Sequence, residues 1–296
     1  MKNLLEYYYN IFPDKIYENN NTYYFFLDDI KYYFVIFNRN IGELNSLVEL
    51  TNKLYFKGIK VHTFIQTKDG KFYIEHEKVN YVLLRVNTNE NEEIDIYDII
   101  RFNNIGIVNS VLPWNKRWEN TVDSFEKEVI ELNNDYPLLT SYFNYYVGLA
   151  ENAISYISNI KYDDKLYLSH KRINFPLTYG SIYNPLTFIF DYKVRDISEY
   201  IKEMFFYSKF SEDEIFELID LNNYSLNDIK LLYGRLLFPT YYFDLFEGVL
   251  NHEREEKEID KIINLSKSYE LFLKELYFNL KLKYNIEPID WIVNNK

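Results

Sequence analysis

The sequence predicts an α+β protein with a small β-rich lobe followed by a larger, mainly helical lobe. Aromatic and β-branched segments, separated by turn residues, fill residues 14–37 and 60–86, and one helical segment lies between them. A polar, acidic run follows at residues 87–93, and helical periodicity dominates after it. We therefore predict an N-terminal lobe over residues 1–88 and a C-terminal lobe over residues 89–296.

In the N-terminal lobe, Pro13 is predicted to end a short helix over residues 1–12. Asn40 is a suitable N-cap for a helix over residues 41–56, which carries apolar residues at helical spacing. Asp69 and Gly70 predict a hairpin between the two strands that flank them. The predicted strands of this lobe cover residues 16–17, 22–27, 32–37, 60–67, 71–76 and 81–86.

In the C-terminal lobe, two short strands are predicted at residues 166–168 and 186–190. The charged run over residues 252–258 is expected to be a solvated helix start, since acidic residues are favoured near a helix N-terminus. The predicted helices of this lobe cover residues 94–102, 114–133, 137–158, 194–209, 211–221, 225–248 and 253–284.

Composition excludes several classes of function. The chain has a net charge of −12 and no cysteine, which argues against nucleic-acid partners, a disulfide framework and a thiol nucleophile. No stretch approaches the ~18 consecutive apolar residues of a membrane span, so we expect synthesis and retention in the cytosol. The 31 Tyr and 23 Phe residues reflect either the codon usage of an AT-rich genome or tyrosines used for surface contacts and cross-linking.

The arrangement around His170 and Asp191 carries most of the functional information. A histidine ends one short apolar run and an aspartate ends the next, which is the layout of the catalytic segment in kinase-like phosphotransferases. Asp191 is a candidate magnesium ligand, although aspartate is also common in turns. His170 is either a hydrogen-bonded structural residue or an acid–base group. Asp196 is expected to cap the following helix, and Arg195 to pair with a carboxylate.

The acceptor side departs from this layout. Arg172 stands where the catalytic aspartate belongs, and a guanidinium cannot accept a proton. The metal-binding asparagine expected near Leu177 and Thr178 is absent. Asn184 is the nearest substitute, and it equally suits a turn initiator before Pro185.

The nucleotide side departs as well. Asn19–Asn21 replace the glycine-rich loop that would let the backbone approach phosphate. The third strand carries no inward lysine, because Lys31 precedes it and Arg39 follows it. Glu43 and Glu49 could be cofactor-site partners of that missing lysine, or part of a solvated helix face.

A series of segments forms a recognisable pattern: Trp114–Trp118, Gly148–Ile154, Ser169–Arg172, Tyr183–Pro185, Asp191 and Arg195–Lys202. This pattern resembles the CotS/YutH-type spore coat proteins of endospore-forming Firmicutes, which are related to aminoglycoside and choline phosphotransferases. The resemblance implies a bilobal protein-kinase-like fold, spore coat proteins as partners, and a location in the mother-cell cytoplasm and then the coat. By position, Arg172 stands where the catalytic base of active relatives would be, and Asp191 stands where their magnesium ligand would be.

Three functions remain open at this point. The first is a pseudokinase that acts in coat assembly through protein contacts, with no cofactor. The second is an active phosphotransferase with rearranged catalytic residues that uses ATP and magnesium. The third is an aromatic-rich structural protein. Departures on both sides of the site favour the first function, since catalytic groups act as a unit.

Overall fold

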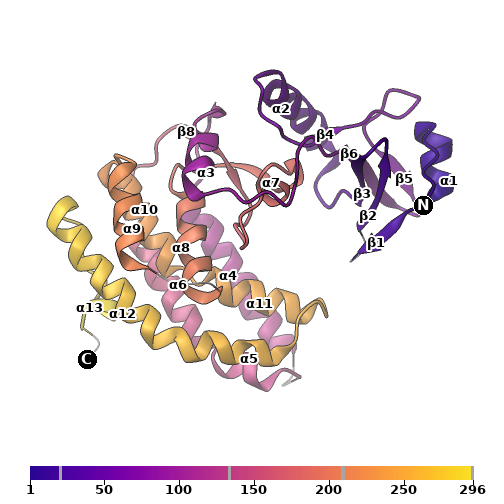
Figure 1. Cartoon of the computed structure of the whole chain (residues 1–296). Coiled ribbons are helices and arrows are strands. Elements are labelled where there is room, and N and C mark those ends of the chain that lie inside the picture. The colour runs from indigo at the N-terminus through magenta and orange to yellow at the C-terminus, as the bar shows by residue number, and fades with distance from the viewer. Residues whose placement is uncertain (20–21, 133–134, 208–210, 295–296) are drawn as a thin grey trace. The chain divides into compact units, whose positions relative to one another are not determined.

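The computed structural model describes residues 1–19, 22–132, 135–207 and 211–294. It divides into two compact units (Figure 1). The first contains residues 1–95 and 176–188, and the second contains residues 96–175 and 189–296. A single boundary after residue 88 stays a prediction, because each observed unit combines two separate stretches of chain. The predicted α+β class is confirmed, with an antiparallel sheet in the first unit and mostly helices in the second.

The sheet of the first unit is antiparallel and centred on β3 and β6. Its strands are β1 (Tyr17–Asn19), β2 (Thr22–Leu27), β3 (Ile30–Ile36), β4 (Thr63–Phe64), β5 (Ile74–His76) and β6 (Val79–Arg85). Asp28 and Asp29 join β2 to β3 with φ values of 47° and 61°, and Glu77 and Lys78 join β5 to β6 with 51° and 64°. Positive φ at both central residues gives the tight turn whose twist matches that of the strands.

The predicted hairpin at Asp69 and Gly70 is wrong. A tight turn does form there, since the Thr67 amide donates to the Lys71 carbonyl at 2.7 Å. However, β4 and β5 both pair with β6 and not with each other. The reason is that β6 is the strand with consecutive buried residues, so each short strand pairs with it.

The helices of the first unit are short except for one. They are α1 (Lys2–Leu4), the π-helix η1 (Leu5–Tyr9), η2 (Ile41–Glu43), α2 (Leu44–Phe56), α7 (Tyr179–Ile182) and η3 (Pro185–Thr187). Asn40 accepts a hydrogen bond from the Gly42 amide at 2.9 Å, which confirms the predicted cap. The N-terminal helix ends earlier than predicted, at Asn10 with a φ of 58°.

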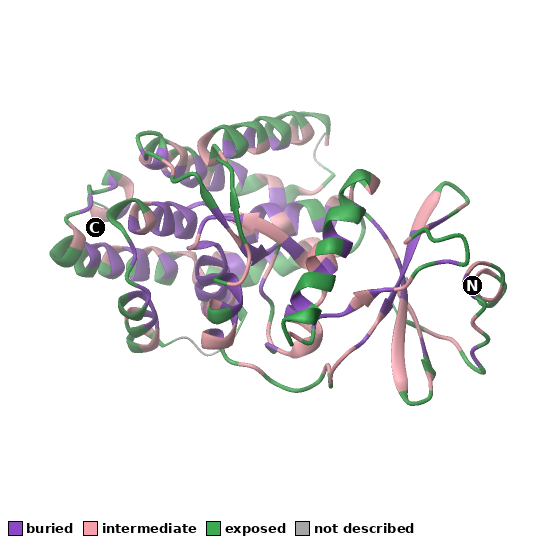
Figure 2. Cartoon of the chain, turned by 90° about the horizontal axis from the view of Figure 1, so that it is seen from above, coloured by how far each residue is buried: buried purple, intermediate pink, exposed green. Residues whose placement is uncertain are grey.

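The second unit is a helical assembly in which α10 contacts α6, α8 and α12. Its buried residues lie along the helix faces that turn toward one another (Figure 2). The helices are α3 (Ile96–Asn103), α4 (Trp114–Glu131), α5 (Pro137–Ser141), α6 (Phe143–Ile157), α8 (Arg195–Tyr207), α9 (Glu212–Leu221), α10 (Leu226–Leu237), α11 (Thr240–Leu250), η4 (Glu256–Glu258), α12 (Ile259–Tyr284) and α13 (Asp290–Asn294). Within the described ranges, no helix is long and apolar enough to cross a membrane.

Two predicted helices are divided in the structure. The segment over residues 225–248 breaks at Pro239, because proline lacks the amide that would continue the helix. The segment over residues 137–158 becomes α5 and α6. A small sheet of order β7-β8-β9 also includes a strand that the sequence did not predict; its members are β7 (Ile107–Asn109), β8 (Lys165–His170) and β9 (Phe188–Asp191).

Candidate functional site

The small sheet and α8 place the predicted residues together. His170 is the last residue of β8, and Asp191 is the last residue of β9. These strands are neighbours, and α8 begins four residues after Asp191 at Arg195. The two residues that the sequence singled out therefore end adjacent strands.

His170 is completely buried and held by Asp196. The Asp196 carboxylate accepts the His170 backbone amide at 2.8 Å and lies 2.7 Å from the ring nitrogen Nδ1. The ring also stacks on Phe102 with a centroid distance of 5.5 Å. This geometry supports the structural interpretation of His170. The predicted capping role of Asp196 is wrong, because this residue lies inside the first turn of α8 and its carboxylate bonds to His170.

Asp191 has no exposed surface, and its Oδ1 atom accepts three hydrogen bonds. The donors are Arg235 Nη2 at 2.6 Å, Trp114 Nε1 at 2.8 Å and the Tyr192 amide at 2.7 Å. The Oδ2 atom lies 3.9 Å from Arg195 Nε, which confirms that Arg195 pairs with a carboxylate. The carboxylate predicted to bind metal is therefore engaged in a buried ion pair.

This environment does not fit a magnesium ion. Magnesium is bound through carboxylate oxygens and keeps several waters, which requires an accessible site. Asp191 is sealed, and Arg235 supplies the positive charge that a metal would bring. Across the described ranges, no group of three or more His, Asp or Glu side chains is arranged to hold a metal ion.

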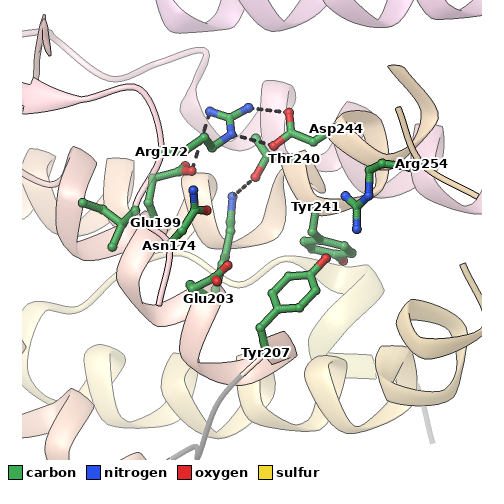
Figure 3. Close-up of a pocket in the computed structure, with 11 residues that line it drawn as sticks. Arg172, Asn174, Glu199, Glu203, Tyr207, Thr240, Tyr241, Asp244 and Arg254 are labelled. Atoms are coloured by element: carbon green, nitrogen blue, oxygen red, sulfur yellow. Dashed lines mark hydrogen bonds and ion pairs between the residues drawn. The ribbon is translucent and has the colours of Figure 1, made fainter. Parts of the chain in front are cut away.

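Arg172 is fixed by two carboxylates. Its Nε and Nη2 atoms both donate to Asp244 on α11 at 2.5 Å, and Nη1 lies 3.6 Å from Glu199 (Figure 3). Burial alone would lower the pKa of Arg172, but the neighbouring Glu199 and Asp244 carboxylates raise it above its ordinary value. The residue in the position of the base is therefore a permanent cation, and its bidentate bonding occupies both Asp244 oxygens.

Two further charged residues on α8 complete the cluster. Burial would raise the pKa of Glu199, but Arg195 and Arg172 lower it to about 2. Lys202 Nζ donates to the Phe238 carbonyl at 3.0 Å and to Thr240 Oγ1 at 2.8 Å. Burial lowers the pKa of Lys202 to about 7, and Glu199 opposes this change. Both residues lie within the Arg195–Lys202 segment but were not predicted as site residues, although their spacing from Arg195 places them close to the same side of a helix.

The predicted nucleotide-side residues belong to the first unit, whereas the cluster belongs to the second. Glu43 pairs with Arg39 at 2.7 Å in an exposed ion pair, and Glu49 is exposed on α2. Asn184 Oδ1 accepts the Leu186 amide at 3.1 Å where η3 begins, as the turn interpretation predicts. Asn20 and Asn21 of the predicted loop lie outside the described residues.

The prediction that Lys31 precedes the third strand is wrong. Lys31 is the second residue of β3, and its Nζ atom is 2.9 Å from Glu90 Oε2. Tyr33 donates its hydroxyl hydrogen to Glu90 and accepts a bond from Lys31 at 2.8 Å. The first unit thus contains a lysine–glutamate pair, but the glutamate comes from the acidic run at 87–93 and not from α2.

Comparisons with solved structures identify the fold. The chain is similar to an aminoglycoside phosphotransferase from Alicyclobacillus acidocaldarius, with a TM-score of 0.58 and 10% identity over 92% of this chain and 94% of that one. It is also similar to spectinomycin phosphotransferase APH(9)-Ia in complex with ADP and spectinomycin, with a TM-score of 0.59 and 15% identity over 93% and 92% of the two chains. The fold is therefore that of the aminoglycoside phosphotransferases, which confirms the bilobal kinase-like prediction.

Sequence comparison then identifies the family. Residues 2–276 match the family described as "Spore coat putative kinase YutH", and the chain belongs to it. A curated relative, the endospore coat-associated protein YutH of Bacillus subtilis strain 168, is 27% identical over 273 residues. That alignment covers 78% of this chain and 79% of the relative. The resemblance drawn from the segments between Trp114 and Lys202 is confirmed.

Proposed function

We propose that this protein is a pseudokinase of the spore coat, with a phosphotransferase fold that no longer transfers phosphate. The observation that carries the proposal is the buried pair of Asp191 and Arg235. An active centre of this class needs a carboxylate that holds magnesium against the nucleotide phosphates. Here a guanidinium takes that place with a hydrogen bond of 2.6 Å.

The acceptor side supports the same proposal. Arg172 cannot remove a proton from an acceptor hydroxyl, and Asp244, the nearest carboxylate bonded to it, has both oxygens engaged by Arg172. Losing the base and the metal ligand together should abolish phosphate transfer, because these groups act as a unit.

The biological role proposed is coat assembly through protein contacts. The curated relative is described as coat-associated, and the family is described as a spore coat family. The partners are other coat proteins, met in the mother-cell cytoplasm and retained in the coat. A net charge of −12 favours a partner with a basic surface.

The first experiment measures thermal unfolding with ATP and either magnesium or manganese. A ligand that binds only the folded chain stabilises it by about 2.7 kcal/mol at 100 times its Kd. We expect no change in Tm at millimolar nucleotide and no transfer of the labelled γ-phosphate. A nucleotide-dependent rise in Tm that Asp191→Asn abolishes, together with phosphate transfer, would establish the alternative of an active phosphotransferase.

The second experiment tests the role in the coat. Asp191→Asn keeps the shape of the side chain and removes the charge that a metal would need. Because it also breaks the buried pair with Arg235, the comparison requires equal amounts of folded protein. If the protein acts through contacts alone, the variant restores coat assembly in a deletion strain as well as the wild-type chain does, provided that both accumulate equally. Failure of an equally abundant Asp191→Asn protein would argue that phosphotransfer chemistry is required.

A further inference from the structure

A cavity of about 290 Å³ in the second unit is lined by both aromatic and charged side chains. The aromatic ones include Trp114, Trp118 and Phe238. Trp118 stacks on Phe238 with a centroid distance of 4.4 Å, which gives the lining a rigid apolar surface. The charged ones belong to the cluster around Arg172 and Lys202, and Arg235 packs 4.3 Å from the Trp114 ring centroid.

The lining has more cations than carboxylates. The cations that line the cavity are Lys171, Arg172, Arg195, Lys202 and Arg235. The carboxylates that line it are Glu199, Asp244 and Glu247. Asp191 adds one negative charge through its pair with Arg235, so one positive charge is left over when Lys202 is protonated, that is, below its pKa of about 7. This surplus occurs in a chain whose net charge is −12.

One of the cations also has an unused donor. Arg235 is only 2% exposed, and its Nε atom makes no hydrogen bond to any described residue. Leaving a buried donor of a charged group unbonded is costly, so such a group usually has a partner. An anion inside the cavity would supply both the missing charge and an acceptor.

We propose that this cavity binds a small organic anion, with its carboxylate or phosphate near Lys202 and Arg235 and its apolar part against the stacked rings of Trp118 and Phe238. The inference rests on the proposed function in one respect, because it treats the cluster around Asp191 as free of metal. It goes beyond that function by assigning a ligand class to the remaining cavity. Phosphate monoesters and aromatic carboxylates share the required chemistry.

The test uses the full chain with Trp291→Phe, in buffer that contains EDTA and no nucleotide. Trp291 contacts Tyr145 and Glu270 and does not line the cavity, so its removal leaves Trp114 and Trp118 as reporters. Phenyl phosphate, benzoate, inorganic phosphate and benzylamine are titrated while tryptophan emission and heat are recorded. Comparing the affinities for phenyl phosphate and benzoate shows whether the cavity prefers a phosphate or a carboxylate.

We expect saturable binding of phenyl phosphate or benzoate, at least tenfold tighter than that of inorganic phosphate or benzylamine. Lys202→Met should weaken this binding tenfold or more. Lys230→Met is the matched control, because Lys230 pairs with Glu287 on the surface and does not line the cavity, and it should leave binding unchanged. Urea unfolding confirms that each variant is folded.

A second variant guards against misfolding of Lys202→Met. Thr121 lines the cavity from α4, and Thr121→Phe narrows the space without altering any charge, so it should also weaken binding. The proposal is overturned by no saturable signal, by equal binding of benzylamine, or by binding that both variants leave intact. Phosphate transfer from ATP would instead overturn the proposed function, and the EDTA titration would still report the anion separately.

Discussion

Replacing Arg235 with methionine should strongly destabilise the protein, because it leaves the buried Asp191 carboxylate with only Arg195, 3.9 Å away, as a cation. Asp191 has no exposed surface and Arg235 is 2% exposed, so water screens this pair little. Breaking a buried ion pair by removing one partner costs about 3–5 kcal/mol. Bonds from Trp114 and the Tyr192 amide remain, which places the expected loss at the lower end of that range.

The assay is urea unfolding followed by circular dichroism, which gives the free energy of unfolding for each variant. A loss of about 3 kcal/mol corresponds to a roughly 150-fold change in the folding equilibrium constant. Lys230→Met, on the same helix, removes a surface ion pair with Glu287 and should cost less than about 1 kcal/mol.

A double variant separates the charge effect from the change of shape. Asp191→Asn combined with Arg235→Met removes both charges, and we expect it to recover most of the free energy lost in the single variant. Equal losses of stability in Arg235→Met and Lys230→Met would contradict this prediction. So would a double variant no more stable than Arg235→Met, because the loss would then come from packing alone.

Four other predictions concern packing and pH. Gly234→Ala should cost about 1–3 kcal/mol in urea unfolding, because the new Cβ would lie 2.4 Å from Ile157 Cγ2. The pKa of Lys202 is lowered to about 7 in the folded chain, so between about pH 7 and 10.5 the unfolded chain holds a proton on Lys202 that the folded chain has lost. The free energy of unfolding should therefore rise with pH over this range, and Lys202→Met should flatten the rise. The pKa of Glu199, about 2, should make stability fall as pH drops from 4.5, and Glu199→Gln should remove that slope. Burial lowers the pKa of His62 to about 4, so stability should also fall as pH drops from 6.5 to 4, and His62→Phe should abolish this part of the loss. For each of the three titrating residues, equal slopes of stability against pH in the variant and the wild type would contradict the prediction.

The sequence predicted elements best where local chemistry decides them. Asn40 caps η2, the turn that leads into α2, through its own side chain, and Asn184 starts η3 in the same way, so both could be predicted from a few neighbouring residues. The hairpin at Asp69 and Gly70 failed because strand pairing depends on which third strand is available.

The capping role given to Asp196 failed for a related reason. Its position before a helical segment suited a cap, but His170 comes from a strand 26 residues earlier and takes the carboxylate. No local pattern contains that partner. Lys202 and Glu199 were missed for the same reason, since their changed pKa values arise from burial and from charges on other elements.

The sequence alone was enough to predict the family, and it placed Arg172 at the position where the catalytic aspartate is expected. It left Asp191 as a candidate metal ligand, since an aspartate at a strand end looks the same whether or not it is accessible. Only the tertiary structure decided its environment, because α10 brings Arg235 to within 2.6 Å of that carboxylate from 44 residues further along the chain. Charge pairing of this kind depends on distance and burial, which are properties of the folded chain.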